Sequence, residues 1–411
     1  MTTAGLDDER IILCLNSGSS SVKFALFQCR EPKERLLARG AVERIGLQAG
    51  LLRVLGPAKE ILAELNRDFA DHNVAVHAAL DALASLNLPR PEAVGHRLVH
   101  GGAERDSPTI VDPRLLADLK KLIAFAPLHL PAEIKGIEAV SRRFPGILQV
   151  ACFDTAFHRR LPEMAQRFPL PRTIWDHGVR KYGFHGLSYE YILDVLGEAA
   201  RGRTIIAHLG NGASMAAVRD GQPLDTTMGF TPTGGLMMGT RCGDLDPGIL
   251  LYLFREKGRS VAGIEDLVNH QSGLLGVSGI SSDMKTLLEM KNNDPRASLA
   301  VEMFCYHARK HIGALAAVLE GLETLVFTGG IGERAAPVRR SVCRGLAYLG
   351  IKLDPALNES HAGTISTAGS SCKVLVVPTD EDLMIARHTY NVSSDREGPG
   401  RSSSRDGTGK H

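Results

Sequence analysis

Two strand–turn–strand segments with glycine- and serine-rich turns constrain the fold more than any other feature of this sequence. They occupy residues 11–27 and 204–219. Small polar residues between two apolar strands are typical of a β-hairpin with an amide-rich tip. Either hairpin alone is equally compatible with an ordinary turn of an α/β protein, but the pair indicates two halves of similar construction. Their strands and turns are Ile11–Leu15, Asn16–Ser21 and Val22–Phe27 in the first, and Thr204–Leu209, Gly210–Ser214 and Met215–Arg219 in the second.

The length of 411 residues also indicates two domains, because single hydrophobic cores stop growing beyond roughly 250–300 residues. Apolar residues make up 44% of the chain, enough for two cores. We expect an N-terminal lobe at 1–153, completed by a returning helix at 383–392, and a C-terminal lobe at 154–382. The segment 393–411 is rich in Ser, Gly, Arg and Asp and has no apolar anchor, so we predict a disordered tail there.

The other elements follow an α/β order along the chain. Ser188 is expected to be the N-cap of a helix that runs to Glu198. The segment Pro378–Glu381 is expected to open a helix that continues through Arg387. The remaining predicted helices lie at 71–86, 132–144 and 297–319, and the remaining predicted strands lie at 147–153, 324–327 and 374–377.

Charge and composition argue against several classes of partner. The formal net charge is only +2, no dense basic stripe is present, and aromatic residues make up 5%. We therefore expect neither nucleic acid nor a membrane surface as a partner. No apolar run reaches bilayer length, and the N-terminus lacks the basic and apolar regions of a signal peptide. Seven scattered Cys without a CxxC pair are typical of a reducing compartment, so we predict a cytoplasmic protein.

Three glycine-containing turns follow buried strands, and the third is Thr328–Glu333. Glycine lets backbone N–H groups approach a phosphate closely. None of the turns is a Walker A loop or the G-x-G-x-x-G fingerprint of a dinucleotide fold. One such turn is weak evidence, but three of them in a duplicated plan indicate a nucleotide held between two lobes.

Three cationic residues stand beside these turns or inside apolar strands. Lys23 is either an exposed strand lysine or a ligand of a phosphate beside the serine turn. Arg97 lies in a largely apolar strand, where an unpaired guanidinium is costly, so it forms either a structural ion pair or a fork that grips a carboxylate or phosphoryl group. Arg241 lies in the glycine-rich loop Gly239–Asp244. Two such arginines suit a reaction between two anions.

One carboxylate and two histidines complete the candidate groups. Asp154 ends the strand at 147–153, and a carboxylate at such a strand end faces the crevice in α/β folds. His185 lies in the segment Tyr182–Gly186 and His129 in Ala126–Pro131, but a single histidine is more often structural than functional. A zinc enzyme remains a minor alternative, because no HExxH or H-x-H pair occurs.

Together these segments resemble the acetate kinase family, a member of the acetate/propionate kinase group within the superfamily of actin, Hsp70 and sugar kinases. The likeness runs from about Ile11 to about Arg387. It implies an α/β fold with two lobes of a duplicated actin-like ATPase (ribonuclease H-like) domain and a central interlobe cleft. The motifs that carry it are NSGSSSVKF, GHRLVHGG, APLH, FDTAFH, YGFHGLS, HLGNGAS, TPTGGLMMGTRCGDLDP, FTGGIGE and TDEDLMIAR.

The resemblance also implies roles for individual residues, with ATP as co-substrate, Mg²⁺ (or Mn²⁺) as the metal, a small carboxylate as substrate and a homodimeric assembly. Asp154, His185, Arg241 and His129 would be catalytic, and Asn16 and Glu381 would hold the metal. Arg97, Val99, Leu128, Phe184 and Pro232 would bind the acid. Residues Ser19, Ser21, Lys23, His208, Leu209, Gly210, Asn211, Gly212, Asp283, Met284, Lys285, Gly329, Gly330, Ile331, Gly332 and Glu333 would bind ATP.

Four positions depart from what is usual in that family. Leu130 stands where many members have Asn, which affects one wall of the acid pocket. Lys285 stands where Arg is usual beside the nucleotide, so its stacking on adenine would be weaker. Arg334 and Asp380 each stand where Asn is frequent, and Asp380 adds negative charge near the metal. None of these changes removes a residue that the chemistry needs.

The implied reaction is reversible transfer of the γ-phosphoryl group of ATP to acetate, by direct in-line displacement. A carboxylate is already ionised at pH 7 and needs no general base, so positioning and charge neutralisation should dominate. Asp154 then has no proton to take, and we expect it to orient the metal or to fix an arginine. The alternatives are a propionate kinase and a non-enzymatic, nucleotide-driven binding protein of the actin or Hsp70 kind.

Overall fold

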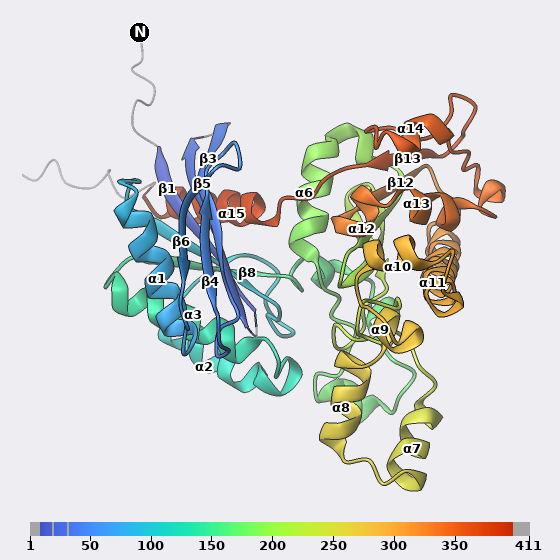
Figure 1. The fold of residues 1–411 in the computed structure, drawn as a ribbon, viewed down its shortest axis with the longest axis horizontal. Coiled ribbons are helices and arrows are strands. Elements are labelled where there is room, and N and C mark those ends of the chain that lie inside the picture. The colour runs from blue at the N-terminus through green and yellow to red at the C-terminus, as the bar shows by residue number, and fades with distance from the viewer. Residues whose placement is uncertain (1–8, 19, 31–32, 398–411) are drawn as a thin grey trace, which may run out of the picture. The chain divides into compact units, whose positions relative to one another are not determined.

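The computed structural model describes residues 9–18, 20–30 and 33–397. These residues form two compact units, each with its own β-sheet (Figure 1). Unit 1 is built from residues 9–101, 107–156 and 381–397, and unit 2 from 102–106 and 157–380. Apart from the short segment 102–106, the chain leaves unit 1 after residue 156 and returns to it with its last described helix.

The sheet of unit 1 has the strand order β5-β4-β3-β2-β1-β6-β8-β7. Strands β1 to β5 form an antiparallel meander, β1, β6 and β8 run parallel, and β7 is an antiparallel edge strand. The strands are β1 (Arg10–Ser17), β2 (Ser21–Arg30), β3 (Lys33–Glu43), β4 (Leu51–Leu55), β5 (Ile61–Asn66), β6 (Ala93–Leu98), β7 (Thr109–Ile110) and β8 (Leu148–Phe153).

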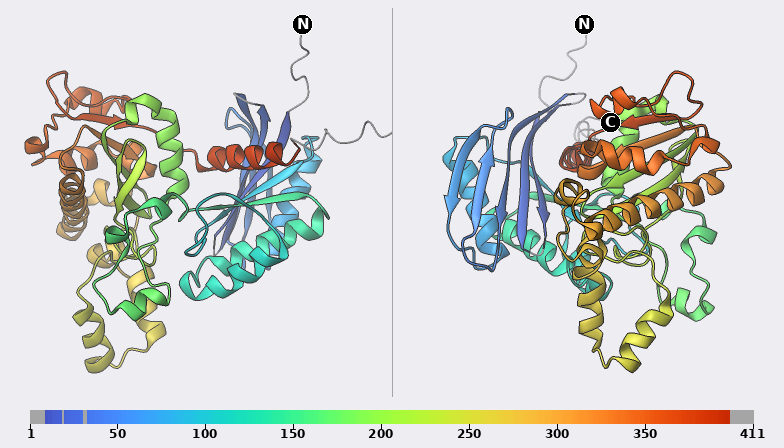
Figure 2. Two further views of the ribbon diagram at one scale, coloured as in Figure 1. Left: turned by 180° about the vertical axis from the view of Figure 1, so that it is seen from behind. Right: turned by 45° about the vertical axis from the view of Figure 1, so that its right-hand side comes forward.

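Helices cover both faces of this sheet. Successive side chains along β6 point to opposite faces, and each face contacts different helices. Val94 belongs to the core cluster that includes residues of α1 and α3. A Cβ at the next residue, Gly95, would lie 2.3 Å from Thr389 Oγ1 and 2.5 Å from Ile385 Cγ2 of α15, so α15 packs on the opposite face (Figure 2). The helices are α1 (His72–Ser85), α2 (Pro113–Lys121), η1 (Leu122–Phe125), α3 (Leu130–Arg143) and α15 (Glu381–Glu397).

The sheet of unit 2 has the order β11-β10-β9-β12-β13. Strands β9, β10 and β11 are antiparallel, whereas β12 and β13 run parallel to β9. The same plan, three antiparallel strands followed by two parallel ones, occurs in unit 1 as β3-β2-β1-β6-β8. The predicted duplicated α/β fold is thus confirmed. The strands are β9 (Arg203–Leu209), β10 (Ala213–Arg219), β11 (Gln222–Thr226), β12 (Thr324–Thr328) and β13 (Lys373–Val376).

Helices α6 and α11 pack on the sheet of unit 2. Tyr189 and Ile192 of α6 share a core cluster with Ile206 and Val218 of the sheet, and α11 packs against β9, β10 and β11. The helices are η2 (Phe157–Arg160), α4 (Glu163–Gln166), α5 (Arg172–Asp176), α6 (Gly186–Leu196), η3 (Gly197–Ala200), α7 (Pro247–Glu256), α8 (Val261–His270), α9 (Gly273–Ser278), α10 (Met284–Met290), α11 (Pro295–Leu319), α12 (Gly329–Arg334), α13 (Ala336–Cys343), η4 (Ala347–Leu349) and α14 (Pro355–Glu359).

Two local predictions are wrong. Ser188 is not an N-cap: α6 begins at Gly186 with His185 as its N-cap, and the Ser188 hydroxyl bonds to tertiary partners. The predicted tail begins too early, because α15 continues to Glu397 and Ser393 is 3% exposed. Residues 398–411 of the predicted tail lie outside the described residues. Among the described helices, none is both long and apolar enough for a bilayer crossing.

Candidate active site

Arg97 gathers two other predicted site residues at one edge of the unit 1 sheet. Strands β1, β6 and β8 are parallel, so their carboxyl ends meet at that edge. Arg97 of β6 pairs in register with Asn16 of β1, and Asp154 directly follows β8. The Arg97 Nε and Nη2 atoms donate to Asp154 Oδ1 and Oδ2 at 3.2 and 2.5 Å. Nη1 donates to Asn16 Oδ1 at 3.2 Å. The guanidinium is therefore held at three points.

Glu381, the first residue of α15, adds a second carboxylate to this group. Its Oε2 atom lies 3.8 Å from Arg97 Nε. Burial disfavours the charge on Arg97, but Asp154, Glu381 and Glu133 together raise the pKa of the guanidinium. The Asp154 side chain is 1% exposed and that of Arg97 is 17% exposed, so the pair is largely withdrawn from water while one side of the arginine stays accessible.

Glu133 of α3 is a buried carboxyl that sequence reasoning missed. Both of its oxygens accept the Val99 N–H, at 3.2 and 3.1 Å. Burial raises the pKa of Glu133 to about 8; Arg97 and the Val99 N–H oppose this shift, and Asp154 adds to it. The only local signal was a lone acidic residue on the buried face of the predicted helix at 132–144. The contact anchors the backbone two residues after Arg97.

The tip of the first hairpin lies next to Asn16. Lys23 pairs directly with Asn16 in the β1–β2 ladder, so the two side chains lie on the same face of the sheet, and Lys23 is exposed. The Gly18 N–H donates to Ser21 O at 2.8 Å and closes the turn. Ser19 lies outside the described residues. An exposed lysine beside an amide-rich turn has the chemistry of a phosphate ligand.

The remaining predicted residues of unit 1 lie at the start of α3. His129 is the N-cap of this helix, and Leu128 before it is 37% exposed. Leu130 is fully buried in a core cluster with Leu98 and Phe153. The apolar side chain therefore contributes to the core of unit 1.

His185 of unit 2 is held in a fixed orientation. It adopts a left-handed backbone conformation (φ 61°, ψ 25°) at the start of α6, which is uncommon for a residue other than glycine. Its Nδ1 atom lies 2.9 Å from Ser214 Oγ. Its ring stacks on that of His208, with 4.3 Å between centroids, and His208 Nδ1 lies 2.8 Å from Ser188 Oγ. These contacts leave the Nε2 side of His185 to face the second hairpin.

Gly212, at the tip of that hairpin, brings His185 and Arg241 together. A Cβ added at Gly212 would lie 3.4 Å from His185 Nε2 and 3.6 Å from Arg241 Nη1. The same Nη1 atom donates to Pro232 O at 3.2 Å. Two side chains that carry N–H groups thus flank a glycine turn, an arrangement suited to anionic oxygens.

The third glycine turn lies beside the second hairpin. A Cβ at Gly210 would lie 3.9 Å from Gly330 N. Gly329 has a positive φ of 75°, which favours glycine, and a Cβ there would also lie only 2.8 Å from Leu209 O. Glu333 Oε1 accepts the N–H groups of Gly329 and Thr379, at 3.0 and 3.2 Å. The carboxylate of Glu333 therefore fixes the loop. Ile331 and Gly332 complete this turn in α12.

The segment predicted near adenosine also belongs to this group. Gly239 N donates to Asn211 O at 3.0 Å, and a Cβ at Gly239 would lie 3.3 Å from Ser282 O. The next residue, Asp283, is the N-cap of α10, and hydrogen bonds from Thr286 lower its pKa. Met284 is buried and Lys285 is exposed.

The structure therefore places the predicted residues in two groups. Unit 1 holds Arg97, Asn16, Asp154 and Glu381 in contact, and unit 2 holds His185 and Arg241 around the second hairpin. Val99 and Leu128 belong to unit 1, whereas Phe184, which is 1% exposed, and Pro232 belong to unit 2. The convergence of Arg97, His185 and Arg241 in one site, and the common acid pocket, stay predictions.

Two hydroxyl groups of unit 2 were also missed. Ser214 binds His185 and lies 2.5 Å from Tyr189 Oη, and Ser188 links His208 to Thr379. Ser214 was visible as the last residue of the second turn, but its partner depends on tertiary packing. Ser188 was misassigned because its position resembles a helix start.

Asn16 and Glu381 fit a hard divalent cation. Their amide and carboxylate oxygens are the donor type that Mg²⁺ prefers, and this ion commonly takes only one or two protein ligands together with waters and substrate phosphates. Both side chains approach the same guanidinium from different elements, β1 and α15. The two donors thus share one edge of the unit 1 sheet.

Comparison with known proteins gives a consistent family assignment. The family model described as the Acetokinase family matches residues 11–387. An acetate kinase of Rhodopseudomonas palustris (strain TIE-1) is 48% identical over 394 residues, 93% of this chain and 98% of that protein. The crystal structure of Porphyromonas gingivalis acetate kinase is 43% identical, covers 93% of this chain and 100% of its own, and has a TM-score of 0.85.

A propionate kinase structure from Francisella tularensis is also similar. It is 37% identical, covers 93% of this chain and 99% of its own, and has a TM-score of 0.87. The match of the family model spans both sheets and all three glycine turns. The chain belongs to the acetokinase family.

Proposed function

We propose that this protein catalyses the reversible transfer of the γ-phosphoryl group of ATP to acetate, giving acetyl phosphate and ADP. The observation that carries the proposal is the pair of side chains around Gly212. His185 Nε2 and Arg241 Nη1 both flank this turn and offer N–H donors to the charge that a transferring phosphoryl group develops on its equatorial oxygens.

The acid is positioned by Arg97. Its guanidinium forms a two-point contact with Asp154, which leaves its orientation fixed before the substrate binds. A fixed arginine fork can hold the carboxylate so that one oxygen lies in line with the γ-phosphorus. Asp154 acts through Arg97 and takes no proton, because the attacking carboxylate is already ionised at pH 7.

ATP is held by the second hairpin and the third glycine turn of unit 2, with Lys23 of unit 1 on the phosphate path. Mg²⁺, or Mn²⁺ in its place, would be held by Asn16 and Glu381 and would neutralise charge on the β- and γ-phosphates. His208 orients His185 by ring stacking, and Glu333 keeps the glycine turn in place through two backbone N–H groups.

An acyl hydroxamate assay tests the proposal. ATP, Mg²⁺, acetate and hydroxylamine should yield acetohydroxamate in proportion to ADP. ATP hydrolysis without hydroxamate would overturn the assignment and favour a nucleotide-driven binding protein.

Propionate is the second candidate substrate, because one similar structure is that of a propionate kinase. One methylene in an apolar pocket changes transition-state binding by only about 1–3 kcal/mol, so propionate should react with lower efficiency. Acetate and propionate competing in one assay rank the two acids. A higher kcat/KM for propionate would make this a propionate kinase.

We also assign the protein to the cytoplasm as a homodimer. Cys29, Cys242, Cys305, Cys343 and Cys372 are free thiols, which fits a reducing compartment. Helices α7 and α8 contain no buried residue. Their apolar side chains are 45–73% exposed at Ile249, Leu251, Phe254 and Val261. We expect a second copy of the chain to bind this apolar surface. Light scattering after size exclusion should give twice the chain mass, and Phe254→Asp should lower it; a monomeric wild-type protein would contradict the assignment.

A further inference from the structure

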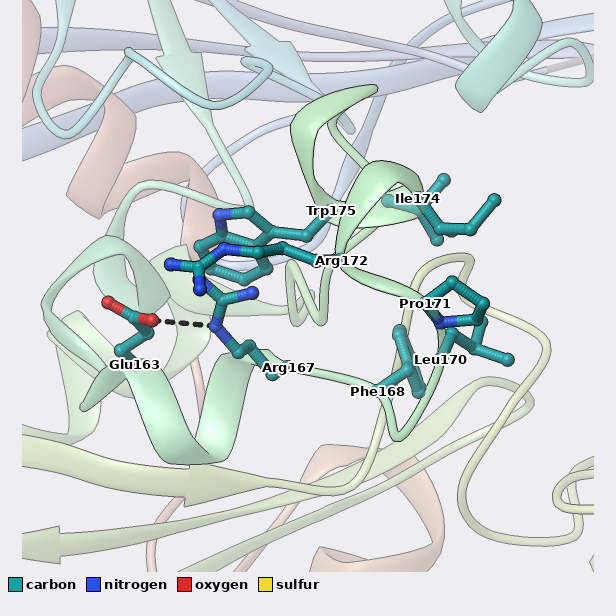
Figure 3. Close-up of a pocket in the computed structure, with 9 residues that line it drawn as sticks. Glu163, Arg167, Phe168, Leu170, Pro171, Arg172, Ile174 and Trp175 are labelled. Carbon is teal, nitrogen blue, oxygen red and sulfur yellow. Dashed lines mark hydrogen bonds and ion pairs between the residues drawn. The ribbon is translucent and has the colours of Figure 1, made fainter.

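Unit 2 contains a concave site formed by a segment to which the proposed reaction assigns no role. The segment 163–179 lines an open cavity of about 350 Å³. Figure 3 shows side chains of α4, α5 and the loop between them around this cavity. Glu163, Arg167, Arg172 and Trp175 line it together with apolar residues such as Phe168 and Ile174. None of its lining residues belongs to the predicted sets for ATP, acid or metal.

The walls of the cavity are tied to the rest of unit 2. Gln166 Nε2 donates to Leu161 O at 2.6 Å, and Gln166 O accepts the Lys181 N–H at 2.7 Å. A Cβ at Gly229 would meet Phe168 Cζ at 3.3 Å. Because both ends of the segment are anchored, the cavity is formed before any ligand enters.

Two guanidinium groups lie over the ring of Trp175 in this site. The Cζ atoms of Arg167 and Arg180 each lie 4.1 Å from the centre of its ring, a distance at which a guanidinium is attracted to the aromatic face. Arg172 contributes a third guanidinium to the lining. Arg167 pairs with Glu163 at 2.6 Å, but that carboxylate is 66% exposed, and exposed pairs neutralise each other weakly.

Two arginines that do not line the cavity add to the positive charge of this region. The Nε atoms of Arg159 and Arg180 are enclosed and have no hydrogen-bond partner among the described residues. Burial lowers the pKa of Arg159, and the neighbouring Arg180 lowers it further, while Asp106 and Glu104 only partly offset the repulsion. Neither residue lines the cavity, so Arg159 and Arg180 contribute positive charge beside it and not a direct contact to a ligand.

We propose that the cavity around Trp175 binds a small phosphate-bearing anion, held by Arg167 and Arg172. Guanidinium forks match the oxygens of a phosphate and bind them with charge-assisted hydrogen bonds. Negative charge also relieves the repulsion among the arginines, and the apolar wall accommodates the uncharged part of the ligand. The site is independent of turnover and lies beyond the proposed kinase reaction.

The chain offers a reporter inside the site, because Trp175 is its single tryptophan. The probe is pyrophosphate, titrated into the full-length protein at constant ionic strength and without acetate, while tryptophan emission is recorded. We expect a saturable change, since a bound anion draws the guanidinium groups away from the ring. The double variant Arg167→Gln/Arg172→Gln should raise the Kd by about tenfold or more, given the loss of two charge-assisted contacts.

Arg160→Gln is the matched control, because Arg160 is exposed in the same region and does not line the cavity. It should keep the wild-type Kd. Calorimetric titration of all three proteins checks binding without relying on the fluorophore, and an unchanged Tm shows that the double variant is folded. Absence of saturable binding, equal Kd values in wild type and double variant, or stronger binding of citrate than of pyrophosphate would each overturn the proposal.

Discussion

Arg97 and Asp154 meet through two hydrogen bonds although 57 positions separate them in the chain. The pair couples the end of β6 to the end of β8, and Asn16 of β1 binds the same guanidinium. Such an arrangement fixes the direction of the one Arg97 edge that a substrate carboxylate could use.

Asp154→Asn should therefore impair the use of acetate more than the binding of ATP. The amide loses the negative charge and replaces one acceptor with a donor that faces the guanidinium, so Arg97 rotates. We expect kcat/KM for acetate to fall on the order of 10²-fold or more, with a smaller change in the KM for ATP. Steady-state kinetics with each substrate varied will measure this, with Asp118→Asn on the exposed surface as control. An unchanged acetate KM with a weakened Mg²⁺ dependence would instead assign Asp154 to the metal.

Arg241→Ala should lower kcat. Its Nη1 atom lies beside the Gly212 turn and is oriented by Pro232 O, so it is placed to stabilise charge on the transferring group. By comparison with other arginines in phosphoryl transfer, kcat should fall on the order of 10³-fold. Arg201 is 73% exposed, and Arg201→Ala should leave kcat unchanged. If Arg241→Ala turns over at close to the wild-type rate, Arg241 does not belong to the site.

Glu133→Gln should change how stability depends on pH. Burial raises the pKa of Glu133 to about 8 from its ordinary 4.5, so between these values the folded chain binds more protons than the unfolded chain. The contribution of Glu133 to the free energy of unfolding therefore falls as the pH rises from 4.5 to about 8. The total fall is about 1.4 kcal/mol for each pKa unit of difference between the folded and unfolded states. Glutamine keeps an acceptor for Val99 and does not ionise.

Thermal unfolding from pH 5 to pH 9 measures this difference. The Tm of the wild type should decline relative to that of Glu133→Gln as the pH rises. Glu138→Gln on the same helix, where the carboxylate is 37% exposed, should follow the wild-type curve. Parallel curves for wild type and Glu133→Gln would show that Glu133 does not titrate in this range.

Arg339→Met should destabilise unit 2. Arg339 is fully buried, and its Nη1 atom donates to the carbonyls of Gly332 and Glu333 at the end of the third glycine turn, at 2.8 and 2.9 Å. Burial lowers its pKa to about 10, so it stays charged at pH 7. Methionine removes these hydrogen bonds, and we expect a loss on the order of 2–4 kcal/mol.

The neighbouring residue provides the control for this change. Arg340 pairs with Glu359 on the surface, and Arg340→Met should stay within about 0.5 kcal/mol of wild type. Differential scanning calorimetry should show a Tm loss of several degrees for Arg339→Met alone. Equal Tm values for the two variants would mean that the buried hydrogen bonds contribute nothing net.

The errors at Ser188 and residue 393 show where local patterns stop being informative. A serine at the right spacing resembles a helix cap, but Ser188 reaches His208 and Thr379 instead, and His185 accepts a left-handed backbone at the helix start. Ser393 looks like the beginning of a polar tail, yet it is buried at the end of α15. Packing against a distant element decided both cases.

The sequence by itself determined the duplicated hairpins, the order of strands and helices, the family and the residue types needed for phosphoryl transfer, because periodicity, turn chemistry and motifs are local properties. Only the tertiary structure decided that Arg97 is bound to Asp154, that Glu133 anchors Val99, and that arginines surround Trp175. Such contacts depend on strand register and on which faces pack together, since hydrophobic burial brings residues that are distant in the chain to one place.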